Sequence, residues 1–308
     1  VFESISGLTT TGATVISGLD ELPQSILFYR QLLQWLGGMG IIVLAVALLP
    51  MLGIGGMQLY RAESPGPVKD NKLVPRLAET AKSLWLLYLS LTVVCMLAYW
   101  AAGMSIFDAI SHSFSTVAIG GFSTHDASIA YFDSPLIEFI AVFFMVVAGI
   151  NFALHFLALQ KRQLKHYLKD PEFQFYVFIL GSVSLITVVV LAADGTYGSL
   201  FEALRRGLFQ VVSFATTTGY ATADFNSWPL FLPYVLLYAA IIGACAGSTG
   251  GGMKVIRILL IFKQGFREVQ RLIHPRAIIP IKLGKKVMSD RIIESVWGFF
   301  AVYVMAFI

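Results

Sequence analysis

Two stretches of this chain, Ser113–Asp126 (SFSTVAIGGFSTHD) and Val211–Asp224 (VVSFATTTGYATAD), match each other without a gap. Their glycines, Gly121 and Gly219, fall in register, and each is followed by an aromatic residue, a threonine and an aspartate at the same spacings. A third stretch near the start of the chain, SISGLTTTGAT, fits the same pattern with Gly12 as its glycine. Internal repetition is the first feature to weigh in a sequence. We therefore predict three copies of one structural unit.

Composition places the chain in a lipid bilayer. Of its 308 residues, 57% are hydrophobic and 13% are charged, and the mean hydropathy is +0.75, far above that of ordinary soluble domains. Several apolar stretches exceed the roughly 20 residues with which an α-helix crosses a bilayer, which favours helices over a barrel. We expect membrane helices at about 26–50, 80–102, 134–159, 173–193, 229–262 and from 292 onward. The predicted fold class is therefore an all-α polytopic membrane protein.

Basic residues gather in three groups, and the formal net charge is +4 at pH 7. The groups are Arg61, Lys69, Lys72, Arg76 and Lys82; Lys161, Arg162, Lys165 and Lys169; and the stretch from Lys254 to Arg291. They follow the first, third and fifth expected helices, so the positive-inside rule places all three groups on the cytoplasmic side. Contact with anionic membrane lipid explains these loops better than binding of nucleic acid.

The segments on the opposite side, 103–133 and 194–228, are too long for tight hairpins and too apolar for solvated loops. We expect short helices there, at about 106–116 and 198–213, followed by exposed backbone. Non-helical backbone at membrane depth is tolerated only where it is buried in protein or lines a water-filled path. The predicted unit is a helix, a re-entrant pore loop and a second helix, named M1-P-M2, repeated around a central pore.

Backbone carbonyls of such loops suit a cation, because they replace its water shell without adding a net charge. Glycine lets the backbone turn these carbonyls toward the axis, and the negative C-terminal ends of the short helices favour cations. The threonines before Gly12 and Gly219 offer hydroxyl oxygens, and their β-branching also favours an extended backbone; the two roles are compatible. The middle copy has Ala118, Ile119 and Gly120 there, so hydroxyls are not required at every position.

Two acidic residues, Asp126 and Asp224, each stand shortly after one of the aligned glycines. Carboxylates at the outer mouth of a pore raise the local cation concentration. Aspartate is equally common in loops because it supports turns. Both interpretations stay open from the sequence.

A second glycine cluster, Gly247–Gly252 (GSTGGG), interrupts the apolar stretch 229–262 and predicts a break in that helix at mid-membrane. We interpret the break as a flexible gate below the pore loops. The alternative is a kink that serves only close helix packing. A phosphate-binding loop is excluded, because Lys254 comes one place late and no strand precedes the glycines.

Neither the histidines nor the cysteines indicate catalysis. The five histidines lack metal-ligand spacing, which predicts that the chain is not an enzyme. Cys95 and Cys245 both lie in apolar stretches, so we expect packing residues and no disulfide.

The motifs TTTGAT, AIGGFST and TTTGYATADF, with the interrupted GSTGGG helix, resemble those of the Trk/Ktr/HKT superfamily of potassium transporters. The stretch Pro50–Glu63 (PMLGIGGMQLYRAE) and the HPR segment at His274–Arg276 resemble the bacterial TrkH branch. The resemblance covers essentially the whole chain. It implies four M1-P-M2 units around one pore, a homodimer in the bacterial inner membrane, and a cytoplasmic nucleotide-binding regulatory subunit of the TrkA type.

The same resemblance implies K⁺ as the transported ion and no bound organic cofactor, with nucleotide only on the regulatory partner. The implied filter residues are Thr10, Thr11, Gly12, Ile119, Gly120, Gly121, Thr217, Thr218 and Gly219. The implied gate residues are Gly247, Ser248, Thr249, Gly250, Gly251 and Gly252. Glycine at Gly12, where sodium-preferring relatives carry serine, favours K⁺. We also expect a fragment, because the sequence starts at the first pore loop and ends within the fourth M1 helix.

The expected organisation follows from these elements. Residues 1–55 hold the first pore loop and M2, 76–160 the second unit, 172–262 the third unit with its broken M2, and 263–308 a basic linker and the start of the fourth M1. The main alternative is a cation-coupled secondary transporter of a small solute, which also uses a discontinuous helix. Parallel repeats and a single broken M2 weigh against it.

Overall fold

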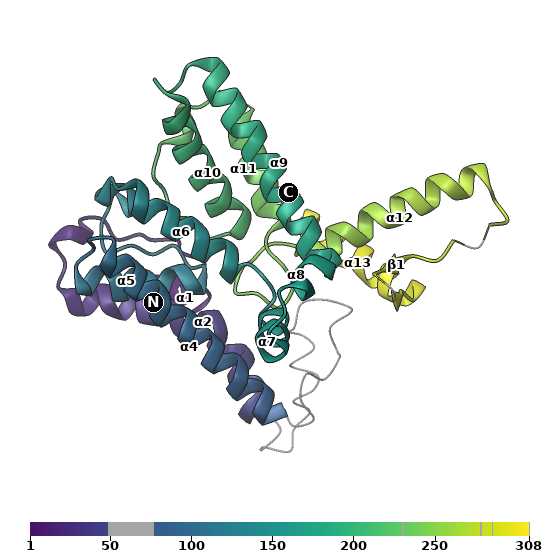
Figure 1. The fold of residues 1–308 in the computed structure, drawn as a ribbon, viewed down its shortest axis with the longest axis horizontal. Coiled ribbons are helices and arrows are strands. Elements are labelled where there is room, and N and C mark those ends of the chain that lie inside the picture. Colours follow the sequence, from purple (N-terminus) through teal and green to yellow (C-terminus); the bar gives the residue numbers. More distant parts are fainter. Residues whose placement is uncertain (49–76, 230, 278, 285, 308) are drawn as a thin grey trace.

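The computed structural model describes residues 1–48, 77–229, 231–277, 279–284 and 286–307 (Figure 1). Its elements are α1 (Phe2–Leu8), η1 (Leu19–Glu21), α2 (Gln24–Leu48), α4 (Leu77–Ala101), α5 (Ile106–Ala118), η2 (Ser128–Phe132), α6 (Pro135–Ala148), α7 (Phe152–Lys161), α8 (Lys165–Lys169), α9 (Pro171–Asp194), α10 (Leu200–Thr216), η3 (Phe225–Ser227), α11 (Leu232–Ile242), α12 (Val255–Ile273), β1 (Lys282–Leu283), β2 (Lys286–Val287) and α13 (Asp290–Phe307). The PMLGIGGMQLYRAE stretch, the first basic group up to Arg76 and the expected boundaries at 55 and 76 lie outside the described residues.

The predicted all-α class is confirmed, with one small addition. β1 pairs antiparallel with β2, with Lys282 opposite Val287. Within the described residues, two helices are long and apolar enough to cross a membrane, in α4 (Ala81–Ala101) and α9 (Pro171–Asp194), and the bent pair α6 and α7 counts as a third if it is one span.

The two short helices α5 and α10 begin at well-defined caps. Ser105 Oγ accepts from the Asp108 amide at 3.0 Å, and Ser199 Oγ accepts from the Glu202 amide at 3.1 Å. A serine N-cap satisfies an amide that the helix leaves unpaired, and an acidic first turn complements the helix dipole. The sequence predicted short helices at these two places.

α5 and α10 each lie between helices of two consecutive copies (Figure 1). α5 packs against α4 of its own copy and against α2 of the copy before it. α10 likewise packs against α9 and α11 of its own copy and against α6 of the copy before it. The short helices therefore hold consecutive copies together.

The second copy has a break that the sequence did not predict. We expected one continuous helix over 134–159, but α6 ends at Ala148 and α7 begins at Phe152, with a bend of 91° between them. The Cys245 amide donates to the Gly149 carbonyl at 3.0 Å, and the Phe152 amide donates to the Gly247 carbonyl at 2.9 Å. The backbone groups that the break between α6 and α7 leaves unpaired are therefore satisfied by the backbone of the non-helical stretch between α11 and α12. The expectation of a single broken M2 is wrong.

A buried ionic cluster joins the second and third copies. Arg205 on α10 donates to both oxygens of Glu138 on α6, at 2.8 and 2.9 Å. Arg206 donates to the Thr222 carbonyl at 2.7 Å and lies 3.2 Å from Glu138. The exposed carboxylate of Asp133 lies at the edge of this cluster, 2.9 Å from Arg205. Buried charges are tolerated when they are paired in this way.

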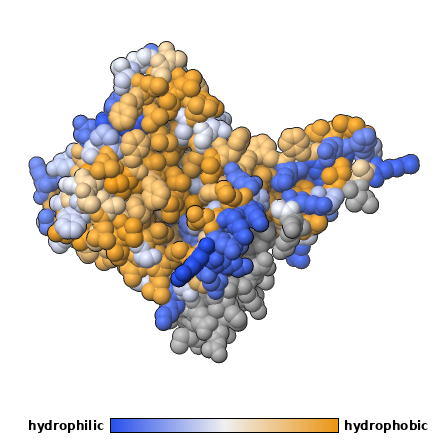
Figure 2. Space-filling model, viewed as in Figure 1, coloured by the Kyte–Doolittle hydropathy of each residue, from blue (hydrophilic) through white to orange (hydrophobic). Residues whose placement is uncertain are grey.

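The last elements form a separate arm. α12 extends away from the helical body, and α13 and β1 pack against its first half (Figure 1). Ile256 and Leu260 of α12 are buried there with Ile281, Ile293 and Val296. Hydrophobic residues cover most of the body's visible face, with a hydrophilic patch near α7 and α8, whereas the α12 arm shows both kinds of surface (Figure 2).

Candidate functional site

Three short segments follow the C-terminal ends of α1, α5 and α10; we name residues 10–12, 119–121 and 217–219 the first, second and third glycine segments. All three share one backbone conformation. The positive φ values are 54° at Thr10, 55° at Ile119, 67° at Thr217, 76° at Gly12, 79° at Gly121 and 87° at Gly219. A β-branched residue rarely adopts this left-handed region, and such strain gathers at functional sites. The repeat seen in the sequence is therefore also a repeat in backbone geometry.

The glycine segments lie side by side. A Cβ added to Gly12 would stand 2.2 Å from the carbonyl oxygen of Gly120. A Cβ added to Gly121 would stand 1.9 Å from the carbonyl oxygen of Thr218. Only glycine permits so close an approach together with a positive φ. The three segments thus form a continuous wall made of backbone.

Hydroxyl groups brace the first and third segments from within. Ser6 Oγ donates to the Ala13 carbonyl at 2.6 Å. Ser213 Oγ donates to the Tyr220 carbonyl, also at 2.6 Å. Threonine hydroxyls pair along the same segments, Thr9 with Thr11 at 2.8 Å and Thr216 with Thr218 at 2.7 Å. These hydroxyls bond to neighbours in their own copy and so fix the backbone around each glycine.

The second segment is braced from outside, by α2 of the first copy. Gln34 Nε2 donates to the Gly120 carbonyl at 2.6 Å, and Gln34 Oε1 accepts from the Ser115 hydroxyl at 2.6 Å and the Phe122 amide at 3.2 Å. Gln31 Nε2 donates to the Phe122 carbonyl at 3.0 Å. Both glutamine side chains are fully buried. Two side chains of one copy therefore hold the backbone of the next.

The glycine cluster predicted as a break lies against the ends of α5 and α10. The non-helical stretch between α11 and α12 contains Gly247–Gly252, as the sequence predicted. Thr249 Oγ1 donates to the Val117 carbonyl at 2.9 Å, and the Gly251 amide donates to Thr217 Oγ1 at 2.7 Å. The stretch is therefore tied directly to the second and third copies where their glycine segments begin.

Buried charged groups hold the same stretch. A Cβ added to Gly250 would stand 2.8 Å from the Thr216 carbonyl oxygen, so the contact requires glycine. Lys254 is buried, and its ammonium donates to the Gly250 carbonyl. Glu172 at the start of α9 accepts from the Ala246 amide at 2.6 Å. Lys254 thus lies inside the protein, although the sequence grouped it with the loop lysines.

Comparison with known proteins identifies the family. The whole of residues 1–308 matches the TrkH family, described as cation transport proteins. The chain belongs to the TrkH family. It is 61% identical over 307 residues to the Trk system potassium uptake proteins TrkH of Salmonella typhimurium (strain LT2) and Escherichia coli (strain K12), over 100% of this chain and 64% of each relative.

A solved TrkH structure matches in three dimensions as well. The crystal structure of the potassium transporter TrkH from Vibrio parahaemolyticus superimposes with a TM-score of 0.88 at 56% identity, over 99% of this chain and 62% of that one. The chain thus spans less than two thirds of the length of these relatives. With its apolar helices, membership of the TrkH family makes it a membrane protein.

In this TrkH-family chain, the first and second copies meet at a charged cluster. His125 Nδ1 pairs with Asp20 Oδ1, and His125 Nε2 lies 3.4 Å from Asp108 Oδ1. Asp126 Oδ2 accepts from the Leu19 amide at 2.9 Å. These contacts tie the loop after the first glycine segment to the loop after the second.

The cluster shifts the proton affinity of its members. Burial alone would lower the pKa of His125, but the neighbouring carboxylates of Asp108 and Asp20 outweigh it and raise that pKa above its usual value. The hydrogen bond from His125 lowers the pKa of Asp20. Cation and carboxylate therefore stabilise each other near neutral pH.

The aspartates singled out in the sequence both accept backbone hydrogen bonds. Asp126 accepts from Leu19, and Asp224 Oδ1 accepts from the Asn226 amide at 3.0 Å and caps η3. Such contacts are those of loop-stabilising residues. Attraction of cations by these carboxylates stays a prediction.

Sequence reasoning missed the buried polar residues of α2. Arg30, Gln31 and Gln34 are each at most 2% exposed. Arg30 Nε donates to Glu3 at 2.8 Å, and its guanidinium lies 4.2 Å from the centre of the Phe122 ring. Polar residues inside an apolar helix mark functional or interhelical contacts, and this signal was available in the sequence.

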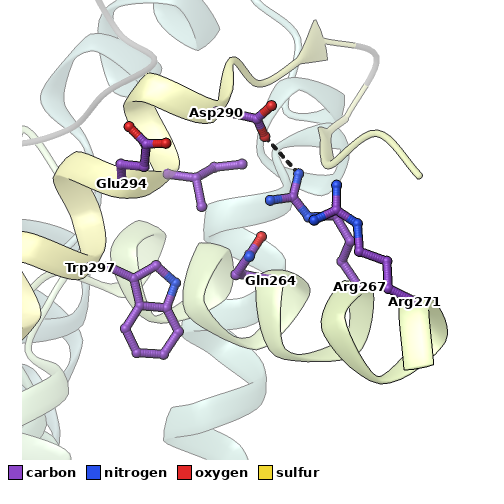
Figure 3. A pocket seen from close by; sticks show the side chains of 7 residues that line it. Gln264, Arg267, Arg271, Asp290, Glu294 and Trp297 are labelled. Carbon is purple, nitrogen blue, oxygen red and sulfur yellow. Dashed lines mark hydrogen bonds and ion pairs between the residues drawn. The ribbon is translucent and has the colours of Figure 1, made fainter. Parts of the chain in front are cut away.

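A pocket lies between α12 and α13 (Figure 3), and no residue of the glycine segments lines it. Arg267 donates to Asp290 at 2.8 Å, and Arg271, Glu294 and Trp297 also line it. Its charges are of both signs, so it offers no clear preference for a cation. Among the described residues, no group of three or more His, Cys, Asp or Glu side chains is arranged to hold a metal ion.

Proposed function

We propose that this protein takes part in K⁺ uptake across the bacterial inner membrane, along a path lined by backbone carbonyls of the three glycine segments. The observation that carries the proposal is their shared geometry: three segments in one left-handed conformation, packed backbone against backbone. Side-by-side carbonyls replace the hydration shell of a cation without trapping it. The C-terminal ends of α5 and α10 point toward the segments and add negative potential.

The stretch Gly247–Gly252 is the gate in this proposal. Its hydrogen bonds to Val117 and Thr217 support this role, because they join the stretch to the chain where two of the three segments begin. Glycines let such a stretch change backbone conformation at low cost. Movement of this stretch away from α5 and α10 would open the path.

The setting follows from the relatives and the charges. Relatives are named as potassium uptake proteins of a Trk system, which supports K⁺ as cargo and a multi-component assembly. We assign the chain to a homodimer with a TrkA-type regulatory subunit on the cytoplasmic side, where nucleotide would bind to that partner. The basic loops would face the cytoplasm and anionic lipid. The activity is transport rather than catalysis, and the chain itself would need no organic cofactor.

One observation favours a second candidate, a cation-coupled transporter of a small solute. Both α6/α7 and α11/α12 are interrupted, and paired discontinuous helices are typical of secondary transporters. The shared direction and backbone geometry of the three glycine segments favour an ion pore over a solute transporter. The two candidates differ in whether flux depends on the glycines.

The test is ion uptake into proteoliposomes that contain the complete gene product. Rb⁺ and Na⁺ uptake would be compared with those of a Gly219→Ser variant, because a side chain at φ 87° costs about 1–2 kcal/mol. We expect Rb⁺ uptake to exceed Na⁺ uptake and the variant to lose that margin. Gly181→Ala on α9, where a Cβ meets no atom within 4 Å, is the control. No flux, or flux indifferent to Gly219, would favour the solute transporter.

A further inference from the structure

The first M2 helix differs from the other two at one aligned position. A proline precedes a glycine by the same spacing in all three M2 segments: Pro23 and Gly37, Pro135 and Gly149, Pro229 and Gly243. At the place of Gln34 in this register, the second copy has Val146 and the third has Ala240. Only the first copy therefore directs a hydrogen-bonding side chain from this place.

Gln34 occupies the space that a side chain at position 120 would need. A Cβ added to Gly120 would stand 2.3 Å from Cδ, 2.5 Å from Oε1 and 2.7 Å from Nε2 of Gln34. Gly120 does not have the positive φ of its neighbour Gly121, so its backbone conformation does not itself require glycine. The three atoms nearest to that Cβ all belong to Gln34, so its side chain accounts for glycine there.

The two positions explain why the second segment departs from the threonine pattern. Thr11 and Thr218 hold the place of Gly120 in the other copies, and the hydroxyl of each pairs with that of the threonine two residues before it. In the second copy, Gln34 fills that space and supplies the hydrogen bonds instead. The aligned serine, Ser115, donates to Gln34 rather than to its own segment's backbone.

We propose that Gln34 is a positioning residue that sets the ion selectivity of the second glycine segment, and that Gly120 is its steric counterpart. The inference rests on the proposed function. Gln34 Nε2 fixes the direction of the Gly120 carbonyl, while Oε1 holds the Phe122 amide on the far side of Gly121. The two anchors fix the positions of the carbonyl oxygens between them. Discrimination between ions depends on the distances between these oxygens.

The experiment is a double-substitution cycle read as the ratio of Rb⁺ to Na⁺ uptake by the complete protein in proteoliposomes. Gln34→Ala and Gly120→Ala are each expected to lower the ratio roughly tenfold, the effect of losing one or two buried hydrogen bonds. Removal of the Gln34 side chain leaves room for the added methyl group. In the Gln34→Ala background, Gly120→Ala is therefore expected to change the ratio by less than about twofold, since its contact is gone.

Two further variants separate positioning from folding. Gln34→Met keeps the volume but removes the donor and acceptor, so it should lower the ratio while the protein still elutes as a folded species in detergent. Gln31→Ala combined with Gly120→Ala should show no relief, because Gln31 does not occupy the space of that Cβ.

The outcomes are distinguishable. A wild-type protein without Rb⁺ uptake above empty vesicles would overturn the proposed function itself. A wild-type protein that prefers Rb⁺, with a Gln34→Met variant that keeps this preference, would overturn only the role of Gln34. Independent, multiplying effects of Gln34→Ala and Gly120→Ala would overturn the steric pairing.

Discussion

At the scale of single residues, the glycine segments depend on a conformation that β-branched side chains normally avoid. The sequence left two roles open for the threonines, added oxygens or an extended backbone. At Thr10 and Thr217 the extended interpretation is wrong, because both have positive φ. Ile119 adopts the same conformation without a hydroxyl. Local propensity does not favour this backbone, and no single-residue preference reveals it.

His125 leads to a prediction about pH. Because its folded-state pKa is raised, its contribution to stability is complete below the usual histidine value of about 6.5 and is lost as pH rises through the raised pKa. The lowered pKa of Asp20 works oppositely: its contribution is present above about 3.9 and lost as pH falls through the lowered value. The melting temperature in detergent should therefore fall between pH 6 and pH 9.

The comparison that isolates His125 is the difference between the wild type and a His125→Gln variant at each pH. That difference should be largest near pH 6 and shrink toward pH 9. Asp20→Asn, which removes one of the two carboxylates, should reduce it partly. Parallel curves for wild type and His125→Gln would show that the cluster is not an ion pair in solution.

At the scale of elements, the two interrupted M2 segments show what the sequence revealed and what it did not. Four glycines in GSTGGG predicted the third copy's break, whereas a single glycine, Gly149, gave no comparable signal for the second. The second break depends on hydrogen bonds with residues far along the chain, Cys245 and Gly247. Local composition cannot report such partners.

Thr249 leads to a prediction for the gate. Thr249→Val keeps the shape of the side chain but removes the hydrogen bond to the Val117 carbonyl. A lost hydrogen bond of about 0.5–1.5 kcal/mol raises the population of the displaced stretch by roughly two- to tenfold. Rb⁺ flux through the complete protein in proteoliposomes should rise by a similar factor.

Thr249→Ser is the matched control, since it keeps the hydroxyl group and should leave the flux near the wild-type value. Deletion of Gly250–Gly252 should raise the flux further. Unchanged or lower flux in a folded Thr249→Val protein would show that Gly247–Gly252 is a kink that serves helix packing and not a gate.

At the scale of the whole molecule, the sequence predicted the copies but not how they are joined. The sequence predicted the all-α class, the short helices α5 and α10 and the three aligned segments, because repetition and hydrophobicity are local patterns. The contacts that join one copy to the next, here called joints, connect residues far apart in the sequence. Gln34 reaches Gly120, and Arg205 reaches Glu138, across long separations in the chain. Each joint connects an M2 helix with the following copy, so the glycine segments hold their spacing only when the copies are assembled.

Glu138 provides the corresponding prediction for stability. Glu138→Gln leaves Arg205 buried with two less buried carboxylates, Asp133 at 2.9 Å and Glu202 at 3.8 Å. The loss of one member of a buried ion pair costs about 3–5 kcal/mol. We expect a clearly lower melting temperature in detergent. Glu202→Gln is the control, because its carboxylate pairs with Arg206 at 2.9 Å and Arg205 at 3.8 Å but is one-third exposed, where pairs contribute at most about 1 kcal/mol. Equal melting temperatures for the two variants would mean that the cluster does not hold the second and third copies together.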